Sequence, residues 1–231
     1  MKKKNVVIFI FAIMFFLIGI GLIIYPYLSN LIYENNVTVQ KKEFILNIEE
    51  KEHRNKLEDL YKKLQEENEN LYREKQNGLV DPFSYEQPSV NLDEYGLSNN
   101  IIGYISIPKM QVELPIILGA NKENMSKGAV HLTQTSYPIG GNNTNCVLAA
   151  HRGYAKAAFF RDIEKLERGD KVYIQNFREE LIYEVDEIKV INPTDIQELL
   201  IRPGEDRITL STCHPYRHNY QRYIVYCKRV K

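Results

Sequence analysis

The chain has 231 residues, and its 30 basic and 30 acidic side chains give a formal net charge of zero. This length allows one sizeable domain with appendages, while the balanced charge argues against nucleic-acid binding, which normally requires a basic excess. The cysteines number three, and an odd count excludes a scaffold in which every cysteine pairs within the chain.

The N-terminus has the features of a membrane anchor. A Lys cluster at residues 2–4 precedes an uncharged apolar run over 6–28, which is long enough to cross a hydrocarbon core of about 30 Å as a helix. Residues 25–27, Tyr-Pro-Tyr, do not supply the small-residue cleavage site of a signal peptide. We therefore expect residues 1–28 to form an uncleaved anchor with a cytoplasmic N-terminus, and the rest of the chain to lie outside the cell.

Residues 29–79 are polar and then highly charged. Apolar side chains recur at helical spacing, and no Gly or Pro interrupts 56–76. We expect an extracellular helical region with one or two amphipathic helices that pack on the following domain. A coiled-coil stalk is the alternative, but the apolar seam is short and is interrupted at Glu67 and Asn68.

A loop over 80–96 contains Pro82 and Pro88, which fix local turns. Residues 97–231 then follow a β pattern. The expected strands cover 101–107, 112–117, 128–132, 146–150, 171–174, 181–185, 208–212 and 222–226. The strand over 181–185 is expected to continue, or to be followed by another, over 188–191. Helical spacing predicts a helix over 157–167 and a short one over 194–200. Several short strands with few helices indicate a closed or nearly closed β-barrel.

Cys213 is the best candidate for a nucleophile. It ends a strand-like run and precedes a polar loop that contains Pro215. A free thiol has a pKa near 8.5, so a nucleophilic cysteine needs a basic or cationic neighbour. His151 ends the apolar run 146–150 in the same way, and two strand ends can meet at one rim of a barrel. His214 is adjacent in sequence, but neighbouring strand residues point to opposite faces.

Arg222 lies nine residues after Cys213, on the expected return strand. A hairpin brings its guanidinium back beside the thiol, where it can hold a substrate carbonyl or a developing oxyanion. Arg217 competes for this role, but an arginine at a loop tip is more often simply solvated. Cys146 and Cys227 lie within apolar strand patterns and are expected to be small buried hydrophobes.

The histidines and cysteines do not form a metal-binding pattern. The chain has no Cys-x-x-Cys spacing, and the histidines at 214 and 218 flank a Pro-containing turn instead of lying on one helix face. His53, His131 and His151 are too scattered in the sequence to complete a cluster. We therefore expect no metal ion and no other cofactor.

Residues 209–213, Thr-Leu-Ser-Thr-Cys, followed by Arg222 and Tyr-Ile-Val, resemble the active-site signature of sortases. Residues 150–153, Ala-His-Arg-Gly, resemble the histidine segment of that family, and the similarity extends roughly over 101–226. The resemblance implies a mainly β fold: a sortase-like eight-stranded β-barrel catalytic domain over 97–231, behind N-terminal amphipathic helices and a single transmembrane helix. It also implies a Gram-positive source.

The same resemblance implies the chemistry of a cysteine transpeptidase. Cys213 would attack the Thr–Gly peptide bond of an LPXTG-like sorting signal, His151 would protonate the leaving amine, and Arg222 would hold the substrate and its oxyanion. Thr212 would belong to the substrate-binding residues. An amine nucleophile would then resolve the thioacyl enzyme.

Residues 81–83, Asp-Pro-Phe, resemble the lid motif of class C sortases, which assemble pili. By this resemblance Phe83 would cover Cys213 and His151, and Asp81 would pair near Arg222. The expected partners are pilins or surface proteins with a sorting signal and an amine acceptor, a pilin lysine or a cell-wall peptide. Class C enzymes usually carry a second hydrophobic segment at the C-terminus, whereas this sequence stops at Lys-Arg-Val-Lys, directly after the last expected strand.

Three alternatives differ from this interpretation. A housekeeping sortase would use the same chemistry but would attach surface proteins to a peptidoglycan amine. A non-enzymatic membrane-anchored scaffold would leave the contexts of Cys213, His151 and Arg222 unexplained. A papain-like protease would place its cysteine before its histidine, and here the order is reversed.

Overall fold

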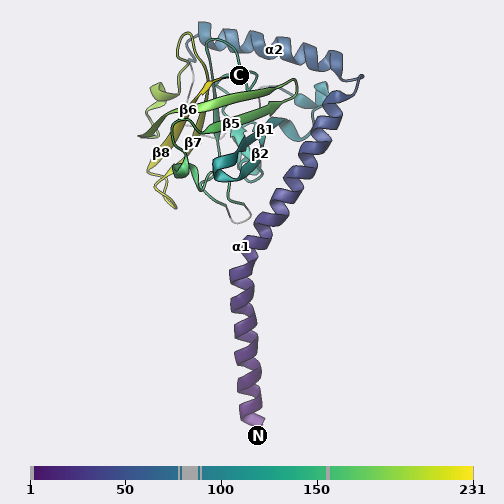
Figure 1. Ribbon diagram of the computed structural model, residues 1–231, viewed down its shortest axis with the longest axis vertical. Helices are drawn as coiled ribbons and strands as arrows, with labels where there is room; N and C mark the ends of the chain where they lie inside the picture. The colour runs from purple at the N-terminus through teal and green to yellow at the C-terminus, as the bar shows by residue number, and fades with distance from the viewer. Residues whose placement is uncertain (1–2, 78, 80–87, 89, 155–156, 231) are drawn as a thin grey trace.

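The computed structural model describes residues 3–77, 79, 88, 90–154 and 157–230, with side chains from residue 7 onward. Figure 1 shows a long N-terminal helix that leads to a β-barrel, with a second helix lying across one end of the barrel. Asp81 and Phe83, the expected lid residues, lie outside the described residues.

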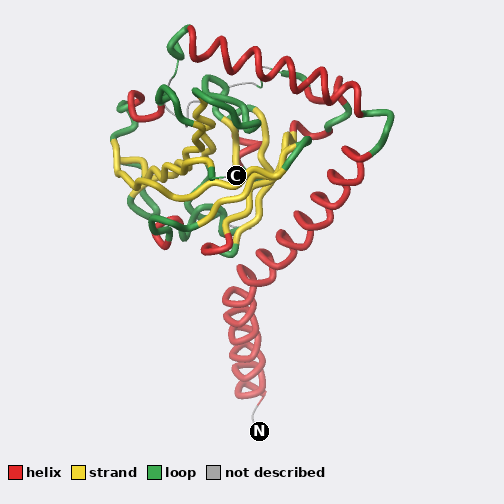
Figure 2. The backbone as a smooth tube through the Cα atoms, turned by 45° about the horizontal axis from the view of Figure 1, so that its top comes forward, coloured by secondary structure: helices red, strands yellow, loops and turns green. Residues whose placement is uncertain are grey.

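The strands form a closed barrel with the order β1-β2-β3-β4-β7-β8-β6-β5, and its wall is visible as the yellow tube in Figure 2. This confirms the predicted eight-stranded barrel. The strands are β1 (Ile101–Ile107), β2 (Val112–Leu118), β3 (Ala129–His131), β4 (Thr144–Ala149), β5 (Lys171–Asn176), β6 (Glu180–Ile191), β7 (Asp206–His214) and β8 (Gln221–Arg229). Pairing is antiparallel except between β2 and β3 and between β4 and β7.

The barrel wall separates two apolar clusters. The inner cluster fills the barrel and continues beneath α1 and α2; on β4, β7 and β8 it takes alternate residues, such as Leu148, Leu210 and Val225. The outer cluster lies on the other face of the same strands, beneath the connection between β6 and β7. Its buried members are Leu79, Ala120, Met125, Val130, Leu132, Val147, Ala149, Ile191, Leu199, Ile224 and Tyr226. The two-residue period of a strand therefore gives the wall a buried surface on both sides.

Helix α1 (Lys3–Glu49) is longer than the expected anchor and continues without a break through Pro26. It is long and apolar enough to cross a membrane, and its most apolar window is not buried against the rest of the protein. The second half docks on the barrel through the buried side chains of Val37 and Phe44. The expected boundary at residue 28 thus lies within one continuous helix and is not the end of an element.

Helix α2 (Arg54–Arg73) packs on the barrel, which confirms the amphipathic helix and excludes an isolated stalk. Leu60 and Leu64 are fully buried, and Leu57 is nearly so. Asn68, which interrupts the apolar seam in the sequence, is also buried, and its side-chain oxygen accepts a hydrogen bond from the Tyr137 amide at 2.7 Å. The interruption is therefore a polar anchor between α2 and the loop that follows β3.

The predicted helix over 157–167 is wrong. The segment forms turns with a single 3-10 turn, η4 (Ile163–Lys165). Phe159 has a backbone φ of +45°, which a right-handed helix does not allow. Three apolar side chains of this segment, Phe159, Phe160 and Ile163, instead belong to the inner cluster. They close one end of the barrel, which explains their spacing without a helix.

The remaining elements are short. The predicted helix over 194–200 is only a 3-10 turn, η5 (Ile196–Leu199). The other short elements are α3 (Lys122–Met125), η1 (Leu92–Tyr95), η2 (Ser98–Asn100) and η3 (Pro108–Met110). Of all these short elements, η5 matters most for the site, because its Leu199 lies in the outer cluster and covers the outer face of β4 and β8.

Replacement of Leu64 by Ala tests the packing of α2. We expect the free energy of unfolding to fall by about 2–4 kcal/mol, because the side chain is fully buried and leaves a cavity. Leu46→Ala is the matched control, because Leu46 on α1 is 56% exposed. Chemical denaturation of the full chain in detergent measures both changes. Equal, small effects would show that α2 contributes little to the stability of the domain.

Candidate active site

Backbone pairing brings three strand ends together at one rim of the barrel. β8 runs antiparallel to β7 and places Arg222 opposite Cys213. β4 runs parallel to β7, and the pairing continues past its end through the Ala150 amide, which donates to the Ser211 carbonyl at 3.2 Å. His151 is the next residue along this ladder. It therefore follows beside Cys213, as the sequence predicted for two strand ends that meet.

Strand alternation assigns these residues to the same face of the wall. Ala149, two residues before His151, lies in the outer cluster, and so does Ile224, two residues after Arg222. Cys213 pairs directly with Arg222 and shares its face. The thiol, the imidazole and the guanidinium therefore gather at the end of the outer face, which η5 covers farther along the strands.

Burial distinguishes Cys213 from the other two cysteines. Cys213 is partly exposed, whereas Cys146 and Cys227 are buried, as predicted. Burial raises the pKa of the Cys146 thiol and of the Cys227 thiol, because a buried thiolate loses its hydration. Among the three thiols, Cys213 is therefore the one that a substrate in solvent can reach.

His151 is half-buried, and desolvation lowers its pKa below the usual value for histidine. Its ring stacks on Tyr154 with centroids 5.1 Å apart and also contacts Phe159 at 6.5 Å. Its backbone carbonyl accepts from the Phe160 amide at 3.0 Å. These contacts hold the ring in place and favour the neutral imidazole, a form that can accept a proton from a thiol and release it readily.

Arg222 is 5% exposed, so its charge is largely removed from water. The guanidinium donates to the backbone carbonyls of Asn219 and Gln221, each at 3.1 Å. The end of the loop after β7 and the first residue of β8 therefore fix the orientation of this side chain next to Cys213. A guanidinium held in this way can donate to an oxygen that gains negative charge.

Thr212 lies on the opposite face. Its side chain is fully buried, and its hydroxyl donates to the Ala150 carbonyl at 2.7 Å. This bond ties β7 to the end of β4, next to Cys213 and His151. The predicted substrate contact of Thr212 stays a prediction, but a hydroxyl that is buried and already bonded argues against it.

Arg152 is a residue that the sequence reasoning missed. Its side chain is 4% exposed and lies between the ends of β4, β7 and η4. One guanidinium nitrogen donates to His214 Nδ1 at 2.9 Å and to the Cys213 carbonyl at 3.4 Å. The other lies 2.6 Å from Glu164 Oε1. Arg152 thus connects the two strand ends from the inner face, directly behind His151 and Cys213.

A signal for Arg152 was present in the sequence. The arginine follows the candidate histidine at the end of an apolar strand, and alternation places it on the face opposite to that histidine. That face is the inside of the barrel, where a charge needs partners. His214 lies there too, next to Tyr223 with centroids 5.6 Å apart, which agrees with the prediction that it does not pair with Cys213.

The described residues hold no group of three His, Cys, Asp or Glu side chains that could ligate a metal ion. His131 is fully buried and stacks on Tyr137 at 4.9 Å. Burial lowers the pKa of His131 to about 4, so the ring is neutral at physiological pH. Its Nε2 lies 3.1 Å from the Thr135 carbonyl, which gives this histidine a structural role in the barrel.

A partly exposed thiol, a neutral imidazole and a fixed guanidinium at one rim define a cysteine-dependent acyl-transfer site on a β-barrel. A sequence profile described as the sortase domain matches residues 105–230. The chain is also 31% identical over 160 residues to Sortase A of Bacillus anthracis, which covers 67% of this chain and 72% of the relative. The chain belongs to the sortase family of cysteine transpeptidases.

Solved structures of class C sortases resemble this chain over most of its length. Sortase C of Streptococcus pneumoniae superposes with a TM-score of 0.73 at 33% identity, over 83% of this chain and 96% of that one. A lid mutant of Streptococcus agalactiae sortase C1 superposes with a TM-score of 0.69 at 34% identity, over 82% and 95%. The structural neighbours are therefore pilus-type sortases.

The Arg152→Gln variant tests whether Arg152 positions the two strand ends. We expect kcat for transpeptidation to fall about 10- to 100-fold with KM nearly unchanged, because a small displacement of reacting groups costs rate without loss of substrate affinity. Arg178→Gln is the matched control, since this exposed arginine pairs with Glu58 at 2.7 Å on the barrel surface. Steady-state kinetics with a sorting-signal peptide measures both. Equal kcat values for the two variants would contradict the positioning role.

Proposed function

We propose that this protein is a membrane-anchored, class C-like sortase that cleaves an LPXTG-like sorting signal and joins the released acyl group to a lysine of a pilin subunit. The observation that carries the proposal is the meeting of Cys213, His151 and Arg222 at adjacent strand ends on one face. Further support comes from the Streptococcus pneumoniae structure, which is described as informative about pilin substrate specificity.

The residues divide the reaction into two acyl transfers. The Cys213 sulfur attacks the threonine carbonyl carbon, and its proton passes to His151. Arg222 donates hydrogen bonds to the oxyanion that forms. The C–N bond breaks as His151 returns the proton to the leaving amine, which leaves a thioester on Cys213. A lysine amine then attacks the thioester, gives up a proton to His151 and releases the thiol with an isopeptide bond formed.

The orientation in the membrane follows from the charge pattern. The Lys cluster at residues 2–4 favours a cytoplasmic N-terminus, so the barrel lies on the extracellular side of a single-pass anchor. This side is where sorting signals of secreted proteins emerge. The proposed location therefore agrees with the proposed substrate.

We also propose that Asp81 and Phe83 form a lid over the site. The motif lies between α2, which ends at Arg73, and η1, which begins at Leu92. Leu79, just before the motif, is buried in the outer cluster, on the face that carries Cys213. The Streptococcus agalactiae neighbour described as a lid mutant adds support from the family.

The Cys213→Ala variant tests the nucleophile. We expect no thioester with a sorting-signal peptide and no transpeptidation, because no other exposed thiol replaces the missing sulfur among the described cysteines. Mass spectrometry of the acyl-enzyme and product analysis measure the two steps, with Cys227→Ala as the control that keeps both. Turnover that persists in Cys213→Ala would contradict the proposed function.

The Phe83→Ala and Asp81→Ala variants test the lid. Loss of a lid increases the fraction of time for which Cys213 is accessible, so its labelling by a thiol reagent should accelerate. If the closed lid is favoured by about 2.7 kcal/mol, the site is open roughly 1% of the time. Complete loss of such a lid would raise the labelling rate by at most about 100-fold. Tyr72→Ala on α2 is the control for loss of an aromatic side chain. Labelling rates equal to that of the control would count against a lid.

A further inference from the structure

Helix α1 meets the barrel immediately after its apolar run. The Asn30 side-chain oxygen accepts from the Ala158 amide at 3.1 Å, and the Tyr33 hydroxyl donates to the Lys127 carbonyl at 2.6 Å. Asn30 and Tyr33 follow Leu28, the end of the run, by only about 3 Å and 8 Å along the helix axis, at about 1.5 Å per residue. These barrel segments therefore lie at the level of the lipid headgroups.

The same contacts lead directly to the candidate site. The Tyr33 ring contacts Phe159 with centroids 5.4 Å apart, and Phe159 contacts His151 at 6.5 Å. Two successive ring contacts thus connect Tyr33, just after the apolar run, to the candidate catalytic histidine. The end of the barrel that holds His151, Cys213 and Arg222 is the end next to the membrane.

The exposed residues of this end have the chemistry of a membrane interface. We define the membrane-side rim as Tyr154 and residues 216–220. Its three tyrosines are all exposed, Tyr220 most strongly at 67%, and tyrosine is enriched where headgroups meet the hydrocarbon. The Arg217 guanidinium lies 5.5 Å above the Tyr216 ring, where it can reach an anionic phosphate.

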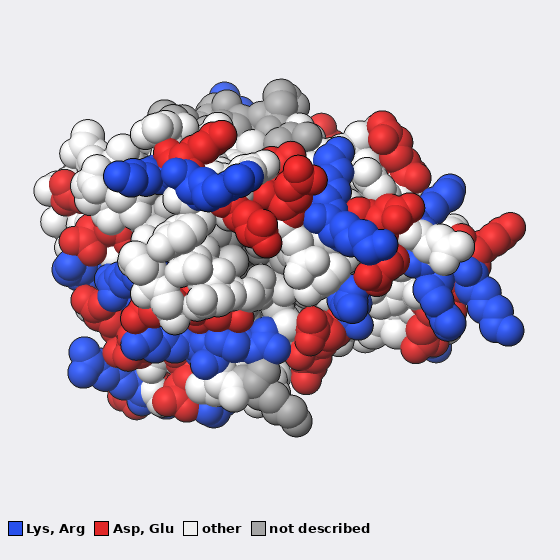
Figure 3. All heavy atoms as spheres, turned by 90° about the horizontal axis from the view of Figure 1, so that it is seen from above, with Lys and Arg blue, Asp and Glu red and all other residues white. Residues whose placement is uncertain are grey.

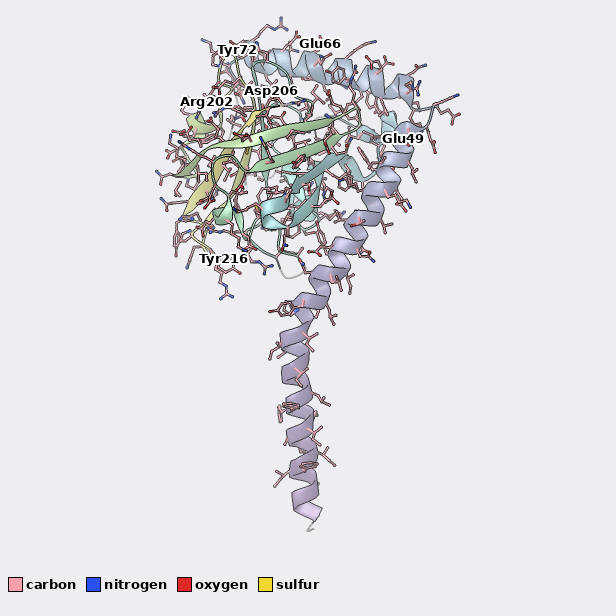
Figure 4. The ribbon with its side chains drawn as sticks, viewed as in Figure 1. Glu49, Glu66, Tyr72, Arg202, Asp206 and Tyr216 are labelled. Atoms are coloured by element: carbon pink, nitrogen blue, oxygen red, sulfur yellow. The ribbon has the colours of Figure 1, made fainter. Side chains whose placement is uncertain are left out.

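Figure 4 shows Tyr216 on the side of the barrel from which the N-terminal half of α1 extends, and Tyr72 at the opposite end, on α2. The surface around α2 differs in character, because acidic and basic side chains are interspersed over the face seen in Figure 3. The two ends of the barrel therefore provide a test face and a control face within one molecule.

We propose that the membrane-side rim rests on the anionic outer surface of the bilayer in which α1 is anchored, with its tyrosines among the headgroups and Arg217 at a lipid phosphate. The bilayer is the occupant that the geometry selects, because α1 leaves it only a few residues before it binds the barrel. Together with the proposed function, this docking presents Cys213 to polypeptides that are themselves anchored in the membrane. A sorting signal would then be cleaved close to where its own chain leaves the lipid.

Tryptophan fluorescence tests the docking without any need for activity. The chain contains no tryptophan, so Tyr216→Trp and Tyr72→Trp each introduce a single probe at similarly exposed positions, 44% and 37%. The full chain is reconstituted in vesicles of phosphatidylcholine and phosphatidylglycerol that carry a spin-labelled headgroup. We expect roughly threefold or greater quenching at position 216 than at position 72, because only the former reaches the quencher. Equal quenching at the two positions would overturn the proposal.

The lipid charge is tested in the Tyr216→Trp background. Arg217→Gln should reduce quenching in vesicles that contain phosphatidylglycerol and leave it unchanged in pure phosphatidylcholine, whereas Arg178→Gln should change neither. Identical quenching with and without Arg217 would overturn the phosphate contact.

The proposed function and the proposed docking can be disproved independently. A chain that is quenched at position 216 but forms no thioester would overturn the proposed function alone. An active chain without quenching at position 216 would overturn only the membrane docking.

Discussion

The parallel pairing of β4 with β7 is the constraint on which the site depends. These strands are far apart in the sequence, and their register decides which residues reach the rim together. A slip of one residue would move the side chains of one strand to the opposite face, so His151 and Cys213 would no longer meet. The Ala150 amide and the Thr212 hydroxyl reinforce the register at the rim itself, at 3.2 Å and 2.7 Å from their acceptors.

Buried arginines hold both ends of β7. At its start, the Arg207 side chain is 1% exposed and pairs with Asp186 and Glu205, each at 2.5 Å. At its end, Arg152, which follows β4, reaches across to the backbone of Cys213. A buried charge costs desolvation energy that its partners only partly restore, so such pairs contribute little to net stability. Their value lies in geometry, because a planar guanidinium with several donors fixes the relative position of the groups it bonds.

The sequence predicts the barrel correctly and also predicts that the three candidate residues lie at strand ends, for a definite reason. A strand has a period of two, and the residues that matter follow directly on apolar runs, so Cys213, His151 and Arg222 can be placed without tertiary information. The helical period is less reliable here. Residues 157–167 have helical spacing, yet Phe159 takes a positive φ because the segment closes the barrel end. Asn68 shows the reverse case, where a polar residue in an apolar seam is needed by a partner far away in the sequence.

The local pattern can place Arg152 on the inner face, but it cannot show what the side chain does there. That role depends on His214, Glu164 and the Cys213 carbonyl, which come from other segments. The same holds for Asn30, which in the sequence is simply a polar residue two positions after the end of the apolar run. In the structure it binds the backbone beside Phe159, which in turn contacts His151.

The position of the anchor therefore constrains the chemistry. A barrel joined to α1 by a flexible linker could sample many heights above the bilayer. A barrel bonded to the same continuous helix within a few residues of the hydrocarbon has its reactive rim held at one level. In the proposed docking, the membrane would take part in selecting the substrate, because a scissile bond far from the lipid would lie out of reach of Cys213. Under this proposal, the contacts between α1 and the barrel would hold the site at one height above the bilayer, and so would reduce the entropic cost of bringing two anchored chains together.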